Sequence, residues 1–282
     1  MLENAAPHTL NAMSALAEGW HPWRPGAKTP WVDLEWCDPH GGRLLAADSW
    51  RVIDGRARGL DVHRDRFLSA ASSFRDDATT FWADVVAALP RTGDWFPRVE
   101  LRERADGTQL GLRLRPTPAT TTEVVVASAP HDPRTQPLIK GPDLDALQSL
   151  RVAVQPRGAG EAIIVDAHGV IVEGAYSGLL WWRGETLMRP RDAVPRIPSV
   201  TVKLVLEAAR AEGVELAEAD ARPADLEGCE LWVLSALHGL RSASAWIAGP
   251  ALGEPKQAHR GRQWLMSETR DIGCASPTLG GQ

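Results

Sequence analysis

Lysine is scarce in this chain, so each lysine is a candidate for a chemical role. The four lysines stand at positions 28, 140, 203 and 256, and arginine supplies the remaining positive charge. Lys140 follows a proline-rich stretch and is preceded by two apolar residues, Leu138 and Ile139. Desolvation among such neighbours lowers the pKa of an amine toward neutrality. A neutral amine can attack a carbonyl carbon or accept a proton, so Lys140 is a candidate nucleophile and base.

Glu173 is the second candidate, because it ends the apolar segment VIVEG. A carboxylate buried there without a cationic partner would be costly. The residues alone leave two interpretations open, a strand-end glutamate that faces water and a carboxylate that faces a positively charged group.

Other common catalytic patterns are missing from the sequence. It contains neither a G-x-S-x-G motif nor a glycine-rich loop that could hold a phosphate. Four histidines, at positions 63, 131, 168 and 238, are not spaced as a metal cluster, so no metal is expected. The three cysteines, at positions 37, 229 and 274, are odd in number and far apart, which indicates reduced thiols.

Composition excludes some partner classes. The net charge is only -5 and the basic residues are scattered, which disfavours nucleic acid and anionic membranes as partners. No apolar run approaches the roughly 18 residues of a membrane span, and the N-terminus lacks a basic start and a long apolar stretch. We therefore expect a cytoplasmic protein.

The elements that must position these residues form two groups. Residues 43–129 predict strands, a tight turn at Asp54-Gly55, helices from about residue 63 and over 78–89, a hairpin around Asp106-Gly107, and a strand over 122–129. A strand is also expected near residues 31–36. This order indicates an antiparallel α+β domain over residues 1–130.

The proline-rich segment 131–138 reads as a linker to a second domain over residues 139–282. That half predicts a helix over 144–154, a β-meander of three strands (EAIIVD, VIVEG and LLWWRG), a helix after Pro198, and strands at LWVLSAL and 242–247. Trp181 and Trp182 are consecutive in a predicted strand, so their side chains should point to opposite faces.

Four segments, taken in order, resemble the class IV aminotransferase family over about residues 44–250. They are VIDGRARGLDVHRDRF, LIKGPDL, EAIIVDAHGVIVEGAYSGLLWW, and IPSVTVKLVLEAA followed by LWVLSALHGL. The family includes branched-chain and D-amino-acid aminotransferases and aminodeoxychorismate lyase. The resemblance implies the two-domain α+β fold of fold type IV pyridoxal-phosphate enzymes, a D-amino-acid aminotransferase-like architecture. It also implies a homodimer and pyridoxal 5′-phosphate as cofactor.

The resemblance further implies residue roles. Lys140 matches the lysine that forms a Schiff base with the cofactor and moves the substrate's α-proton, and Glu173 matches the carboxylate facing the pyridine nitrogen. The phosphate contacts fall on Arg66, Val200 and Thr201, and a further contact, to the phosphate or the substrate, falls on Ser235 and Ala236.

The sequence departs from the family pattern at several positions. Asp145 stands where several members have a tyrosine that contacts the cofactor's phenolic oxygen. Tyr176, the single tyrosine, is a candidate to face the cleft instead. AADSW replaces a glycine-aspartate-glycine run, so Asp48, Ser49 and Trp50 are candidates for a different substrate pocket. Two milder changes are Gly178 for asparagine and Ser199 for glycine.

Amino transfer between an amino acid and a 2-oxo acid is the activity that the resemblance implies first. One alternative is an elimination of the aminodeoxychorismate lyase type, which releases pyruvate from an amino-chorismate-like small molecule. A degenerate member that binds the cofactor or a metabolite without turnover is a second alternative, and an interaction domain without cofactor is a third. An arginine for the substrate's carboxylate would discriminate between transfer and elimination, with Arg183 and Arg241 as candidates.

Overall fold

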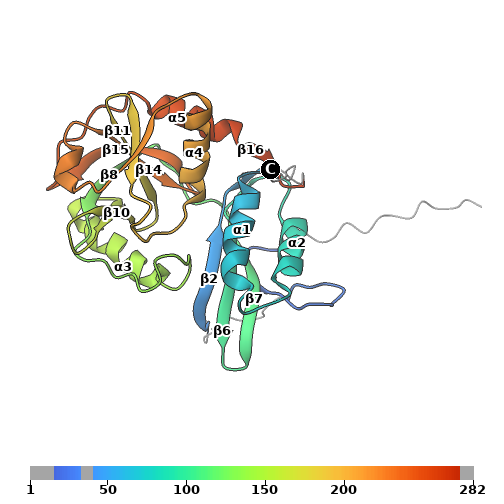
Figure 1. Cartoon of the computed structure of the whole chain (residues 1–282). Helices are drawn as coiled ribbons and strands as arrows, with labels where there is room; N and C mark the ends of the chain where they lie inside the picture. Colours follow the sequence, from blue (N-terminus) through green and yellow to red (C-terminus); the bar gives the residue numbers. More distant parts are fainter. Residues whose placement is uncertain (1–15, 33–40, 274–282) are drawn as a thin grey trace, which may run out of the picture.

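The computed structural model describes residues 16–32 and 41–273. Residues 33–36 of the expected strand near 31–36 lie outside this part. Within it, Trp31 forms an isolated antiparallel bridge with Trp23. Figure 1 shows two bodies of sheet and helix, one built mainly from the first half of the chain and one from the second.

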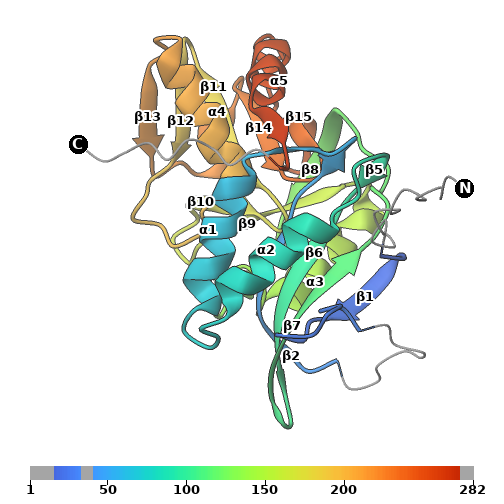
Figure 2. The same cartoon turned by 90° about the vertical axis from the view of Figure 1, so that its right-hand side faces the viewer.

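A four-stranded antiparallel sheet forms the centre of the first half, in the order β1-β7-β6-β2. Two helices lie on one face of this sheet, as Figure 2 shows, and their apolar side chains pack with it around Phe67, Phe81 and Trp82. The elements are β1 (Gly19–Pro22), β2 (Arg43–Ser49), α1 (Leu60–Ala71), α2 (Ala78–Ala88), β6 (Arg98–Arg104) and β7 (Gly107–Leu114).

A smaller sheet, in the order β16-β4-β3-β5, contains the predicted turn at Asp54-Gly55. Both turn residues have positive φ, 47° and 72°, which suits a two-residue hairpin. Helix α1 then begins at Leu60, three residues before the predicted start. The strands are β3 (Val52–Ile53), β4 (Arg56–Arg58), β5 (Asp94–Trp95) and β16 (Thr269–Asp271).

An eight-stranded sheet forms the second half, in the order β10-β9-β8-β15-β14-β11-β12-β13. Its two edges approach each other, because the Ile171 amide of β10 donates to the Ala221 carbonyl just after β13 (2.8 Å). The strands are β8 (Glu123–Ser128), β9 (Glu161–Val165), β10 (Ile171–Gly174), β11 (Gly178–Arg183), β12 (Thr186–Pro190), β13 (Leu216–Ala219), β14 (Glu230–Ser235) and β15 (Gly239–Ile247).

The two faces of this sheet carry different cores. Trp181 packs with Leu231 and Val233 on one face. Trp182 packs on the other, with helices α4 and α5, as their alternation in the strand predicts. The helices are α3 (Leu144–Val154), which packs against β9, α4 (Val200–Ala211) and α5 (Ala258–Ser267), with short 3₁₀ turns at Gln155–Arg157 and Pro223–Leu226.

The predicted β-meander is wrong in its pairing. β9 and β10 pair, but β11 pairs with β12 and β14 instead of continuing along β10. After β10 the chain turns through residues 174–178 and continues as β11. In the order of the sheet, β8, β15 and β14 lie between β9 and β11.

Strand β8 belongs to the sheet of the second half, although it precedes the predicted linker. It pairs in parallel with both β9 and β15, and Val126 and Ala127 are fully buried on its two faces. The sequence assigns these residues to the first domain. The domain boundaries expected from the sequence remain a prediction.

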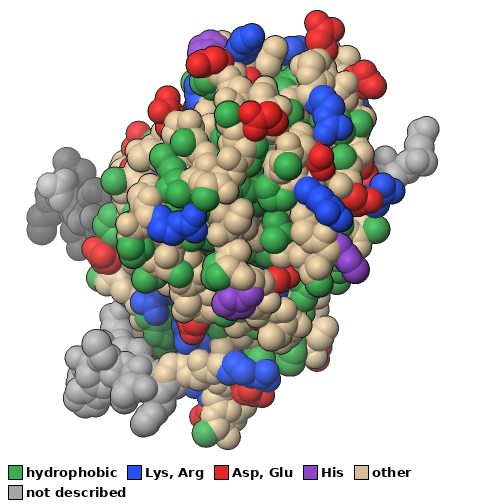
Figure 3. All heavy atoms as spheres, turned by 90° about the vertical axis from the view of Figure 1, so that its left-hand side faces the viewer, with side chains coloured by type: hydrophobic (Ala, Val, Ile, Leu, Met, Phe, Trp, Pro, Cys, Tyr) green, Lys and Arg blue, Asp and Glu red, His purple; other side chains and the backbone are tan. Residues whose placement is uncertain are grey.

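Within the described residues, no helix is both long and apolar enough to cross a membrane. On the face of the molecule shown in Figure 3, Lys and Arg side chains are interspersed with Asp and Glu.

Candidate active site

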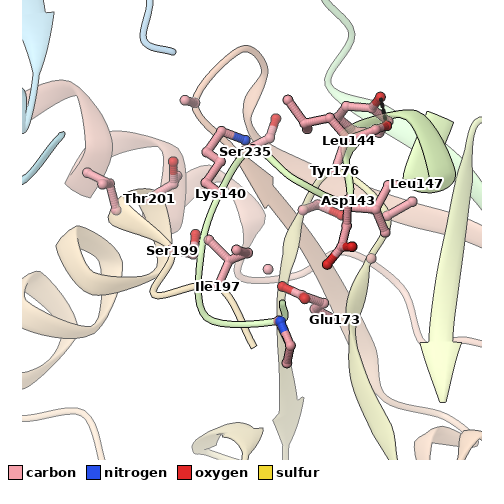
Figure 4. A pocket seen from close by; sticks show the side chains of 18 of the residues that line it. Lys140, Asp143, Leu144, Leu147, Glu173, Tyr176, Ile197, Ser199, Thr201 and Ser235 are labelled. Atoms are coloured by element: carbon pink, nitrogen blue, oxygen red, sulfur yellow. Dashed lines mark hydrogen bonds between the residues drawn. The ribbon is translucent and has the colours of Figure 1, made fainter. Parts of the chain in front are cut away.

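Lys140 and Glu173 line the same two hollows. An inner cavity of about 70 Å³ is bounded by residues from both halves of the chain, and a wider groove of about 1030 Å³ opens beside it. Residues common to both are Arg66, Ile139, Lys140, Glu173, Gly178, Ile197 and Ser199. Figure 4 shows that side chains from a loop, a strand and a helix start surround the inner cavity.

The loop that carries Lys140 lies directly on strand β2. The Ala47 amide donates to the Lys140 carbonyl (2.6 Å). Gly141 has φ +145°, and a Cβ at this position would come within 2.8 Å of the Ala46 Cα. Only glycine therefore allows this close approach, which fixes where the lysine side chain starts.

The Lys140 amine has no hydrogen-bond or ion-pair partner among the residues that the structure describes. Burial lowers its pKa to about 8, assisted by the neighbouring Arg66 and opposed by Asp48 and Glu173. A substantial fraction of the amine is thus neutral near physiological pH, as nucleophilic or base chemistry requires.

Glu173 is buried on β10 and forms an ion pair with Arg134 (2.7 Å). Burial raises the pKa of Glu173 to about 7, and Arg134 limits this increase. Arg134 also donates to Asp132 (2.8 Å) and to the Pro195 carbonyl (2.9 Å). The contact between Arg134 and Glu173 was not predicted from the sequence, because the proline-rich segment around Arg134 is typical of a linker.

Arg66 is fixed by a carboxylate. Its guanidinium donates twice to Asp48 (2.7 Å each) and once to the Pro198 carbonyl (3.0 Å), and His63 contacts the same carboxylate (2.7 Å). Although burial acts to raise it, Arg66 and His63 hold the pKa of the Asp48 carboxyl well below its usual range. Arg66 is therefore oriented toward the cavity, but Asp48 balances its charge.

Helix α4 directs its N-terminus into the cavity. The Ser199 hydroxyl caps it by accepting from the Val202 amide (3.3 Å), which leaves the amides of Val200 and Thr201 without an intrahelical acceptor. These amides and the helix dipole can bind an anion. The serine at position 199 thus has a structural role as the cap.

Gly178 is required by the same helix start. A Cβ at this position would lie 2.5 Å from Val202 Cγ2 and 3.2 Å from Ser199 Cβ. An asparagine could not fit here unless α4 moved away. In this chain, the packing of α4 against β11 therefore leaves no room for a side chain at position 178.

Ser235 and Ala236 end strand β14 and line the inner cavity. The Ser235 hydroxyl accepts from the His238 amide (3.2 Å), which leaves its own hydrogen available to donate. Both residues lie on the same cavity as Val200, Thr201 and Arg66, so all the predicted phosphate contacts converge there. Their cofactor roles remain predictions.

Tyr176 also lines the inner cavity, on the turn between β10 and β11. Its phenol donates to the Leu144 carbonyl at the start of α3 (3.2 Å), shown by the dashed line in Figure 4. Arg151 lies over its ring. Asp145 does not line either hollow.

Four other candidates lie elsewhere. The Ser49 amide donates to Asp48 (2.7 Å), and Ser49 lines neither hollow. Trp50 is buried and lines a separate small cavity. Arg183 is exposed at the end of β11, and Arg241 is buried beside Glu161 (3.4 Å). Neither arginine lines the inner cavity or the groove, and a substrate role for either stays a prediction.

The chain matches a known protein family. A family model described as amino-transferase class IV matches residues 45–246. A search of curated proteins finds no match to the chain.

Several solved structures share the fold. A hypothetical aminotransferase from Mycobacterium tuberculosis, bound to alpha-ketoglutarate and PMP, is 18% identical with a TM-score of 0.72, covering 84% of this chain and 95% of its own. An aminotransferase from Brucella abortus bound to PLP is 15% identical with a TM-score of 0.72, covering 89% and 99%. The 4-amino-4-deoxychorismate lyase from Pseudomonas aeruginosa is 19% identical with a TM-score of 0.69, covering 84% and 95%. At these identities the likeness shows the fold, which confirms the predicted fold class.

Proposed function

Because the chain belongs to the class IV aminotransferase family, we propose that it is a pyridoxal-phosphate-dependent aminotransferase acting on an amino acid and a 2-oxo acid. The observation that carries the proposal is the convergence of three different groups on one cavity. These are the unpartnered amine of Lys140, the buried carboxyl of Glu173, and the anion-binding end formed by Arg66 and the start of α4.

The three groups fit the cofactor's three polar parts. Lys140 would hold its aldehyde carbon, Glu173 its pyridine nitrogen, and the α4 amides with Arg66, Ser235 and Ala236 its phosphate. When bound, pyridoxal phosphate supplies an electron sink that stabilises negative charge at the substrate's α-carbon.

The chain's own residues would transfer the proton, bind the ring nitrogen and orient the cofactor. Lys140 is positioned to take a proton from the α-carbon and return it, which its lowered pKa favours. The Arg134 guanidinium favours the ionised form of Glu173, which can then accept a hydrogen bond from a protonated ring nitrogen. Arg66 and the α4 amides orient the group from its phosphate end.

Elimination of pyruvate is the second candidate, since one solved neighbour is a 4-amino-4-deoxychorismate lyase. It would use the same lysine and the same cofactor contacts. Pyruvate released from 4-amino-4-deoxychorismate, measured beside the consumption of 2-oxo acids, separates elimination from transfer.

The proposal is tested by absorption spectroscopy of the purified protein with added pyridoxal phosphate. We expect a new near-ultraviolet or visible band that borohydride abolishes, with the reduced cofactor recovered on the peptide containing Lys140. Lys140→Ala should give no such band and no attached cofactor. Lys256→Ala, which removes an exposed lysine that lines neither the inner cavity nor the groove, is the matched control and should behave as wild type.

Absence of a band in wild type, or a band unchanged by Lys140→Ala, would contradict the proposal. A band without turnover of any amino acid or of 4-amino-4-deoxychorismate would favour a non-catalytic member. The homodimer and the cytoplasmic location are further proposals, and analytical ultracentrifugation tests the first against a chain mass of 30.6 kDa.

A further inference from the structure

A third, much smaller cavity adjoins the start of α4. Its volume is about 10 Å³, and it shares four lining residues with the inner cavity. The shared residues are His63, Val200, Thr201 and Ala236. Three of these carry predicted phosphate contacts, so the small cavity adjoins the anion-binding end of the site.

Arg58 of strand β4 lines this small cavity and has no hydrogen-bond or ion-pair partner within the described part of the chain. Its guanidinium packs against Gly239, where an added Cβ would lie 2.7 Å from Nη1. Burial lowers the pKa of Arg58, and the nearby Arg51 lowers it further. A desolvated cation without a partner is unfavourable, so this position favours an incoming anion.

A second unpaired donor faces the same region. Trp50 is 1% exposed and lines the small cavity, and its indole N–H finds no acceptor among the described residues. Buried donors in folded proteins are nearly always paired, so the unpaired indole of Trp50 beside the half-buried Arg58 indicates a missing acceptor at this cavity.

Arg58 differs from the two neighbouring arginines in lacking a carboxylate partner among the described residues. Arg66 is balanced by Asp48, and Arg51 is balanced by Asp94. Only Arg58 of these three arginines lacks a carboxylate. A phosphate monoester carries a charge of about -1.5 to -2 at neutral pH, more than the helix start and a neutralised Arg66 can balance.

We propose that Arg58 is a further phosphate-binding residue, which supplies the uncompensated positive charge for the cofactor's phosphate beside Arg66 and the α4 amides. The inference rests on the proposed function for the identity of the phosphate compound. The geometry that carries it, an unpaired arginine and indole beside a helix start, does not depend on that identity.

The test compares Arg58→Met with Arg56→Met. Arg56 lies on the same strand but is exposed, so its loss removes an arginine without touching the cavity. Dissociation constants are measured for pyridoxal phosphate and for pyridoxal, which lacks the phosphate. Melting temperatures of the cofactor-free proteins are recorded with increasing inorganic phosphate.

We expect Arg58→Met to weaken pyridoxal phosphate binding about 10- to 100-fold, the range for a lost hydrogen bond to a charged group, and to leave pyridoxal binding unchanged. Inorganic phosphate should raise the melting temperature of wild type and Arg56→Met but not of Arg58→Met. Without phosphate, Arg58→Met should melt at the same or a higher temperature than wild type, since it loses a desolvated charge, and this shows that the variant folds.

Equal weakening for pyridoxal and pyridoxal phosphate, or full phosphate protection of Arg58→Met, would overturn the inference. Failure of inorganic phosphate to protect wild type would overturn it as well. Protection by phosphate through Arg58 in a protein that does not bind pyridoxal phosphate would support the anion site and reject the proposed cofactor.

Discussion

The ionisable side chains at the cavity differ in whether their charge is balanced. Arg66 is held by Asp48 and Glu173 by Arg134, both through buried ion pairs. Lys140 has no such partner, and its surroundings act on it mainly through burial and the nearby Arg66. Of the two groups with a pKa near the neutral range, about 7 for Glu173 and about 8 for Lys140, only the lysine lacks a charged partner among the described residues.

This difference predicts the pH dependence of covalent cofactor capture at Lys140. The rate should rise as the pH increases through about 8, because Lys140 loses its proton there. An ordinary lysine would show the rise about two pH units higher. Stopped-flow absorbance with excess pyridoxal phosphate between pH 6 and 11 measures the midpoint.

Asp48→Asn provides a comparison for that midpoint. Asp48 raises the pKa of Lys140, so its replacement should move the midpoint to lower pH. A wild-type midpoint near 10, or a shift to higher pH in Asp48→Asn, would show that the lysine is not desolvated as the structure indicates.

The loop before α3 has little regular structure of its own and takes its position from strand β2. Its carbonyl at Lys140 and the missing side chain at Gly141 allow two backbones to lie in direct contact. The position of the Lys140 side chain is therefore set by a strand of the other half of the molecule.

Gly141→Ala should lower the free energy of unfolding by about 2–4 kcal/mol, because it combines a strained φ with a clash against the Ala46 backbone. Gly158→Ala is the matched control, with φ +86° and open space around it, and should cost only about 1 kcal/mol. Urea unfolding measures both, and equal losses would show that the contact with β2 is unimportant. Cofactor capture should slow in Gly141→Ala alone.

Sequence patterns predicted individual elements better than their partners. Helix α3 spans the expected 144–154 because its apolar residues recur at helical spacing. Helix α5 was missed, since Gly261 interrupts its buried side, where Trp232 and Leu240 leave no room for a side chain. The meander failed because alternation identifies a strand without identifying its neighbour.

The same limit applies to the site. The resemblance of four segments to one family predicted residues that line one cavity, including Lys140, Glu173 and Arg66. It did not predict that Asp48 and Arg134 would pair with them, because those ion pairs join residues 18 and 39 positions apart with no periodic relation. Arg58 was also missed, since an unpaired arginine has no signal in a single sequence.

At the scale of the whole molecule, the segment between the halves is part of the site. Arg134, Gln136 and Pro137 line the inner cavity. Asp143 accepts hydrogen bonds from the amides of Thr135 and Gln136 (3.0 and 2.8 Å), so the segment is tied to the start of α3. The segment that joins the two halves is therefore held in place at the cavity by these hydrogen bonds.

Limited trypsin digestion of the native protein should therefore spare the bond after Arg134. The Arg134 side chain is only 6% exposed, and its ion pairs must break before a protease can bind it. The bond after Lys28, in an exposed loop, should be cut first and serves as the internal control. Mass spectrometry identifies the fragments. Cleavage after Arg134 as early as after Lys28 would show that the segment is a loose linker.

The position of β8 determines when the protein can finish folding during synthesis. Val124 of β8 pairs in parallel with Ala243 of β15, and β9 occupies its other side. A ribosome releases β8 long before β15 has been made, so an apolar strand must remain without one neighbour until β15 has emerged. Such strands aggregate readily, and pairings of high sequence separation form slowly. Folding of the second half must therefore wait for the synthesis of β15, and its yield in cells should depend on chaperones that protect β8 during that interval.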